Sequence, residues 1–154
     1  MSGYSNVTFD EIEIGATASA ERVVGQTEIE ALLLVSGDVV PFNLVEGVTV
    51  EPRDLCVEAV AAEAIISGML ERRLPGPGTR IVSQQLEFNG VIRVGDLVRA
   101  TVTVRQKTAG NRGVLFDCTV DAAGETVLRG TVIVEAPHRK ASFPELSRPE
   151  FMIR

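Results

Sequence analysis

Histidine and cysteine carry much of the catalytic and metal-binding chemistry of proteins, and this chain of 154 residues has one histidine and two cysteines. The histidine is His138, near the end of the chain. Cys56 and Cys118 lie in apolar stretches without CxxC or metal-ligand spacing, and are typical of reduced cysteines in a protein core. These residues therefore predict neither a histidine-rich metal site nor a Ser-His-Asp triad, and we expect no metal and no bound cofactor.

The elements that would position a site are helices first and strands afterwards. The first helix is expected to begin at Gln26 and to end at Gly37. Thr27 would be its N-cap, with Glu30 completing a capping box. A second helix is expected over residues 54–73; it is apolar on almost every side, so other elements must surround it.

From residue 80 onward, apolar and polar residues alternate with the period of a half-buried strand. Turn sequences separate four such strands, so neighbours in sequence are expected to pair antiparallel as a meander. An earlier strand at 16–24 is expected to join the same sheet. The four strands are expected at 80–91, 97–107, 113–122 and 125–136.

The expected architecture is α+β: a curved antiparallel sheet wrapped around one long buried helix. Residues 1–136 would form a single domain, followed by a proline-containing tail at 137–154. A single wrapped helix leaves a sheet edge and the helix start exposed. We therefore expect the chain to pair with a second copy, as a homodimer or a larger homo-oligomer.

The net charge of −6 is unevenly distributed: residues 1–63 carry −10 and residues 64–154 carry +4. An acidic chain without an aromatic-basic stripe is not expected to bind nucleic acid. The basic part leaves room for a phosphate-bearing ligand, although arginines that simply coat a sheet face are the more ordinary explanation. The sequence has neither a signal peptide pattern nor a long enough apolar stretch for a membrane span, so we expect a cytoplasmic protein that is not bound to membranes.

Four short motifs follow one another along the chain, with the apolar helix after the first: Ser36-Gly37-Asp38-Val39-Val40-Pro41, Leu74-Pro75-Gly76-Pro77-Gly78-Thr79, Gln85-Leu86-Glu87-Phe88 and Val94-Gly95-Asp96. In this order they resemble the MaoC-like dehydratase or (R)-specific enoyl-CoA hydratase family over about residues 8–138. The nearest similarity is to hydratase domains that precede phosphate acetyltransferase domains. The resemblance implies a hotdog fold, a dimer, and hydration or dehydration of acyl chains carried as thioesters on coenzyme A or acyl carrier protein.

In that family a Ser-Gly-Asp-x-Asn-Pro-x-His loop supplies an Asp and a His. One takes the proton on the α-carbon and the other donates to the leaving hydroxyl. The central helix opens with His-Gly-Met, where a backbone N–H polarises the thioester carbonyl. By resemblance, Asp38 keeps its position, Asn43 stands where the family has His, and Val40 stands where it has Asn. The helix-start positions fall on Glu58, Ala59 and Val60.

A neutral asparagine cannot act as a general acid or base near pH 7, so the resemblance implies an altered and impaired acid–base site. Asp38 could act with Glu58, because two carboxylates in one apolar cleft split their pKa values into a base and an acid. Ala59, Val60 and Val40 would then line the substrate pocket. Both carboxylates also have structural explanations: Asp38 follows Gly37 in a turn, and a helix dipole favours an acid such as Glu58.

Two further functions stay open. The chain could be a non-catalytic hotdog module that binds acyl thioesters or dimerises with an active homologue. It could also be a hotdog thioesterase in which Glu58 or Glu63 acts as base or nucleophile. If coenzyme A binds, the candidates for its phosphates are Arg80, Arg93, Arg99 and Arg105.

Overall fold

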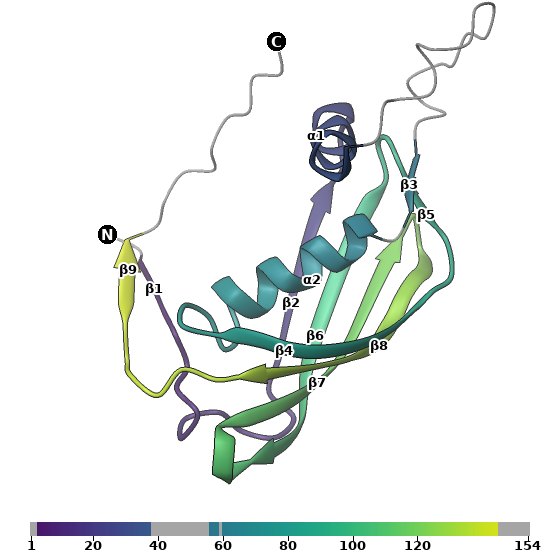
Figure 1. Ribbon diagram of the computed structural model, residues 1–154. Coiled ribbons are helices and arrows are strands. Elements are labelled where there is room, and N and C mark those ends of the chain that lie inside the picture. The colour runs from purple at the N-terminus through teal and green to yellow at the C-terminus, as the bar shows by residue number, and fades with distance from the viewer. Residues whose placement is uncertain (1–2, 38–55, 59, 145–154) are drawn as a thin grey trace, which may run out of the picture.

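The computed structural model describes residues 3–37, 56–58 and 60–144. A five-stranded antiparallel sheet curves around the helix α2 (Val60–Arg72), which lies in its concave face (Figure 1). The expected architecture of a curved sheet around one buried helix is thereby confirmed. In order across the sheet the strands are β2 (Thr17–Val23), β6 (Leu97–Thr108), β7 (Gly113–Ala122), β8 (Glu125–Glu135) and β4 (Arg80–Phe88).

The pairing of β4 differs from the expected meander. β6, β7 and β8 pair in sequence order, and β2 joins beside β6, as expected. β4, however, pairs with β8 at the far edge, with Ile81 opposite Val134. The chain between β4 and β6 forms β5 (Val91–Arg93), which leaves the main sheet and pairs with β3 (Cys56–Glu58). Because this detour separates β4 from β6, the two cannot close a hairpin. Among the described residues, β4 is one edge strand of the sheet and β2 is the other.

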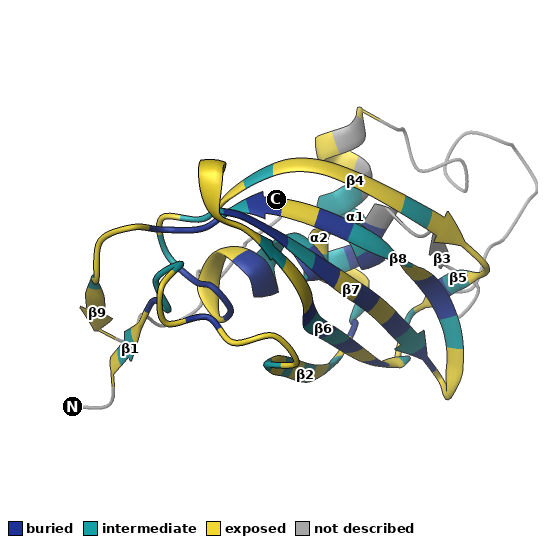
Figure 2. Cartoon of the chain, turned by 90° about the horizontal axis from the view of Figure 1, so that it is seen from below, coloured by how far each residue is buried: buried dark blue, intermediate teal, exposed yellow. Residues whose placement is uncertain are grey.

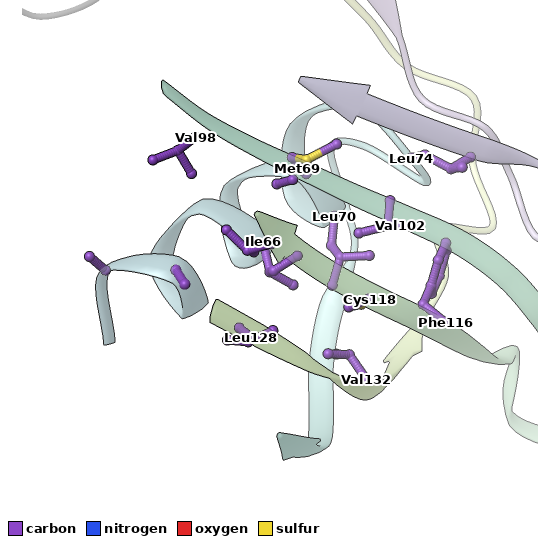
Figure 3. Close-up of a cluster of buried hydrophobic side chains, with 14 of the residues drawn as sticks. Ile66, Met69, Leu70, Leu74, Val98, Val102, Phe116, Cys118, Leu128 and Val132 are labelled. Carbon is purple, nitrogen blue, oxygen red and sulfur yellow. The ribbon is translucent and has the colours of Figure 1, made fainter. Parts of the chain in front are cut away.

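Side chains alternate across the sheet as the sequence period requires. Val102, Phe116 and Leu128 point into the concave face and are fully buried against Ile66 and Leu70 of α2 (Figure 3). The opposite face is polar, and buried and exposed positions alternate along β6, β7 and β8 (Figure 2). α2 thus packs into the concave face, and Ile12, Ile29 and Ile92 from other segments belong to the same buried core, whose burial stabilises the fold.

The first helix begins at Gln26, as expected, but its cap and the start of the second helix differ from the prediction. α1 (Gln26–Ser36) is capped by Gly25, whose N–H donates to the Glu28 carboxylate at 3.0 Å, so the expected Thr27–Glu30 capping box is wrong. α2 begins at Val60 instead of residue 54. Residues 56–58 are extended because they pair with β5, and a short apolar run does not distinguish a strand from a helix.

The two ends of the chain meet in a second, two-stranded sheet. β1 (Gly3–Ser5) pairs antiparallel with β9 (Ser142–Pro144), and this β1–β9 ribbon stands apart from the main sheet (Figures 1 and 2). Part of the segment expected to be an irregular tail thus forms a strand. A 3₁₀ turn, Ala109–Asn111, joins β6 to β7. No helix in the described part of the chain is long and apolar enough to cross a membrane.

Candidate active site

The site positions implied by the resemblance fall where β3 ends and α2 begins. β3 ends at Glu58 and α2 starts at Val60, so two consecutive elements meet at the positions matched to His-Gly-Met. The first N–H groups of a helix have no partner inside the helix, and the helix dipole adds partial positive charge there. The backbone at this junction can therefore attract a carbonyl oxygen that gains negative charge.

Several residues predicted for the site lie outside the described structure. Asp38, Val40, Asn43 and Ala59 are among the residues not described, as are the side chains of Glu58 and Val60. The proximity of the Asp38 and Glu58 carboxylates is therefore still a prediction. The backbone of Glu58 ends β3 two residues before α2 begins, so the alternative of an acid placed at the helix start also stays a prediction.

The short strand β3 leads into α2 and pairs with β5, which follows β4 along the chain. Ile92 of β5 is fully buried opposite Val57 of β3 and closes one side. On β4, Phe88 lies opposite the fully buried Leu128, and paired residues of neighbouring strands point to the same face. Phe88 therefore faces the concave side, yet it is 52% exposed.

Glu63 lies in the first turn of α2 and accepts a hydrogen bond from the side-chain amide of Gln84 on β4. This bond joins the central helix to the free edge of the sheet. Gln84 was not predicted for the site. The strand period could have placed it on the concave face, but its partner depends on β4 lying beside α2, which the sequence does not reveal. Glu63 therefore has a structural role that the thioesterase interpretation did not include.

Three of the four arginines predicted as phosphate ligands already have carboxylate partners. The ion pairs are Arg80 with Glu135 at 2.7 Å, Arg99 with Glu21, and Arg105 with Asp117 at 3.3 Å. They span neighbouring strands, which agrees with the explanation that arginines coat the sheet face. Arg93 on β5 has no ion pair with any described residue, and its backbone N–H donates to Asp96 at 2.8 Å. Of the four, Arg93 is the one on β5, whose partner strand β3 leads into α2.

His138 lies at the opposite end of the molecule. It lines a hollow of about 250 Å³ together with Pro77 and Gly78, which follow the C-terminal end of α2. A 13-residue helix is roughly 20 Å long, so this histidine cannot reach the start of the helix.

No family model matches the sequence. Over 133 residues the chain is 32% identical to the (R)-specific enoyl-CoA hydratase of Rhodospirillum rubrum, covering 85% of this chain and 92% of that protein. The chain belongs to the (R)-specific enoyl-CoA hydratase, or MaoC-like dehydratase, family. This family member is also 28% identical over 138 residues to the 3-hydroxybutyryl-CoA dehydratase of Methylorubrum extorquens, covering 88% of each chain.

Solved structures agree with this assignment of the hydratase family. The unliganded R-hydratase PhaJ1 of Pseudomonas aeruginosa superposes with a TM-score of 0.85 at 26% identity, covering 99% of this chain and all of that one. The (R)-hydratase of Aeromonas caviae, at 24% identity and a TM-score of 0.70, supports the fold, covering 82% of this chain and 98% of that one. The hotdog fold and the family that the motifs implied are thus confirmed.

Proposed function

We propose that this chain is an enoyl-thioester hydratase or 3-hydroxyacyl-thioester dehydratase of the cytoplasm, with an altered acid–base site. Its acyl chains would be carried on coenzyme A or acyl carrier protein. The observation that carries the proposal is the start of α2 at Val60, directly after the strand that ends at Glu58. A helix N-terminus at this position supports activation of a thioester carbonyl.

In the proposed dehydration, the Asp38 carboxylate takes the proton from the α-carbon of a 3-hydroxyacyl thioester. The electron pair moves toward the thioester carbonyl, whose oxygen is stabilised by the N–H groups at the start of α2. The bond from the β-carbon to its hydroxyl then breaks, and Glu58 in its protonated form supplies the proton that makes the leaving group water. Asn43 orients the hydroxyl, since it can donate and accept hydrogen bonds but cannot titrate.

Replacement of the family's histidine by Asn43 should make this reaction slow. The rate of crotonyl-CoA hydration, measured as the loss of enoyl absorbance, should be at least 100-fold lower than the ordinary enzyme rate of about 10 per second. Asn43→His should raise the rate, and Asp38→Ala should abolish it. A wild-type rate near the ordinary value would contradict the impaired site, and full activity in Asp38→Ala would remove Asp38 from the mechanism.

A module that binds thioesters without turnover is the second candidate, because the family's histidine positions hold Asn43 and Glu58. Butyryl-CoA would then raise the melting temperature, while neither crotonyl-CoA hydration nor thiol release would occur. Release of free thiol from butyryl-CoA would instead indicate a thioesterase. The hydrogen bond from Gln84 to Glu63 favours a structural role for Glu63 over that of a hydrolytic base.

We also propose a homodimer formed through the free edge of β4. β4 has nine residues, no described strand pairs with its outer edge, and Val82 and Phe88 are each 52% exposed. Arg80 stands at the start of β4 and Glu87 near its end, so antiparallel self-pairing brings opposite charges together. Sedimentation should give twice the chain mass, and Val82→Lys should shift the equilibrium toward monomer. A monomer at micromolar concentration would contradict this part of the proposal.

A further inference from the structure

We propose that Glu63, oriented by Gln84, is a specificity-determining residue that selects acyl chains carrying a hydrogen-bond donor, such as a hydroxyl group. The carboxylate of Glu63 would accept that donor several bonds beyond the thioester carbonyl. The inference rests on the proposed function and adds to it the chemical class of the acyl chain.

The two residues form a polar pair between the central helix and the edge strand β4. Glu63 lies in the first turn of α2, and its carboxylate accepts a hydrogen bond from the side-chain amide of Gln84. Gln84 stands opposite the fully buried Val132 in the register of β4 and β8, so its side chain points to the concave face, where the helix lies (Figure 1). The bond therefore fixes the direction of a carboxylate beside the start of α2.

The polar pair has apolar neighbours along β4. The next residues of this strand that point to the concave face are Leu86, opposite Gly130, and Phe88, opposite Leu128. A saturated acyl chain gains from contact with such side chains, but it takes water away from a carboxylate without giving it a new partner, which costs free energy. A chain with a hydrogen-bond donor compensates for the lost water. The carboxylate of Glu63 thus favours a polar acyl chain over a saturated one.

The polar pair retains capacity for further hydrogen bonds. A carboxylate has about four acceptor positions, and the amide of Gln84 occupies one of those on Glu63. Glu63 is half-buried and Gln84 is exposed, so a ligand can reach both side chains. A donor on the ligand can therefore bind to Glu63 without breaking the bond from Gln84.

Glu63 also lies at a suitable distance from the proposed position of the thioester. It follows Val60, the first residue of α2, by three residues, which is about 4.5 Å along the helix axis. The Cα–Cβ bonds of a helix tilt toward its N-terminus, so the side chain of Glu63 leans back toward the helix start. A donor bound there is several bonds away from a carbonyl held by the first N–H groups of α2.

Charge indicates which end of the thioester meets the polar pair. Coenzyme A and the phosphopantetheine of a carrier protein bear negative phosphates, which the carboxylate of Glu63 repels. The neutral amide of Gln84 does not cancel this negative charge. The acyl chain is the end of the substrate without phosphates. We therefore place the acyl chain, and not the carrier, beside Glu63.

The affinities of the full chain for two matched thioesters test the preference. 6-Hydroxyhexanoyl-CoA and heptanoyl-CoA differ only by a terminal hydroxyl in place of a methyl group. Calorimetry should give a Kd at least tenfold lower for the hydroxyl compound, which corresponds to about 1.4 kcal/mol. Apolar surroundings alone would give the opposite order, because burial of a methyl group is favourable. Equal affinities, or tighter binding of heptanoyl-CoA, would overturn the inference.

Variants of the polar pair locate the preference. Glu63→Ala should raise the Kd of 6-hydroxyhexanoyl-CoA at least tenfold and leave that of heptanoyl-CoA equal or lower. Gln84→Ala, on the exposed edge strand, should reduce the preference without abolishing it, and it provides the test if Glu63→Ala does not fold. Glu71→Ala is the matched control, since it removes an exposed carboxylate from the last turn of the same helix. Loss of the preference in this control would contradict the role of Glu63.

The same measurements separate this inference from the proposed function. If Glu63→Ala weakens both thioesters by the same factor, Glu63 contacts the carrier portion and the selection of the acyl chain is overturned. Tighter binding of heptanoyl-CoA by the wild type overturns the selection but leaves the thioester function intact. If neither thioester binds, the proposed function fails, and the inference fails with it.

Discussion

The side-chain amide of Gln84, on the free edge strand, donates a hydrogen bond to the carboxylate of Glu63 in the first turn of the central helix. The bond links the element that would meet a second subunit with the element that would polarise the substrate. It therefore couples two parts of the molecule that are 21 residues apart in sequence.

Removal of this bond should cost a small, measurable amount of stability. A double-mutant cycle of Glu63→Ala and Gln84→Ala should give a coupling free energy of about 0.5–1 kcal/mol, since the bond is charge-assisted but partly exposed to water. Urea unfolding of the four proteins measures it. The exposed Gln26–Glu30 pair within α1 is a control that does not involve β4. A coupling of zero would show that the bond does not contribute to stability.

Gly130 allows β8 and β4 to approach closely. A Cβ atom there would lie 2.1 Å from the backbone oxygen of Gln85 and 2.8 Å from the Cα of Leu86, so β4 would have to move. Gly130→Ala should reduce the free energy of unfolding by about 1–3 kcal/mol and weaken the proposed dimer. Gly110→Ala is the matched control, because a Cβ there meets no atom within 4 Å. Equal stability of the two variants in urea would contradict the close approach.

The contribution of Glu11 to the stability of the fold should change with pH only in acid. The N–H of Thr8, and then the Lys140 ammonium at 2.9 Å, lower the pKa of Glu11 from 4.5 to about 2. Because the folded pKa is the lower one, its stabilising contribution is complete above pH 4.5 and is lost as the pH falls through about 2.

The melting temperatures of wild type and Glu11→Gln should therefore differ by a constant amount above pH 5 and converge near pH 2. Glu13→Gln, which removes a nearby exposed carboxylate without side-chain hydrogen bonds to the described residues, is the control for the loss of one negative charge. A difference between wild type and Glu11→Gln that stays constant down to pH 2 would contradict the lowered pKa.

Cys118 should be chemically inert in the folded protein. Burial of the side chain, and to a smaller extent the negative charge of the neighbouring Asp117, raise the pKa of the Cys118 thiol to about 12. At pH 8 almost no thiolate is present, and the side chain is 1% exposed. Iodoacetamide followed by peptide mass spectrometry should label Cys118 only after unfolding in urea. Rapid labelling of this peptide in native protein would show that β7 opens locally.

That these segments of the main sheet form strands was predictable from the sequence. Alternating side chains, such as those around Val102 and Phe116, set the period of a strand, and the neighbouring strands β6, β7 and β8 then follow from short turns. The apolar character of α2 likewise predicted a helix surrounded by other elements. The order of the motifs predicted the family, which the relatives confirm.

The tertiary structure decided which distant segments meet. Whether residues 56–58 become strand or helix depends on β5, because the sequence there is compatible with both. The position of β4 beside β8, and the ribbon that brings Tyr4 to Phe143, also depend on pairing between segments far apart in sequence. Local periodicity specifies what an element is. Which other element it pairs with depends on the packing of the whole chain. That packing also determines where Phe88 and Gln84 lie relative to the candidate site.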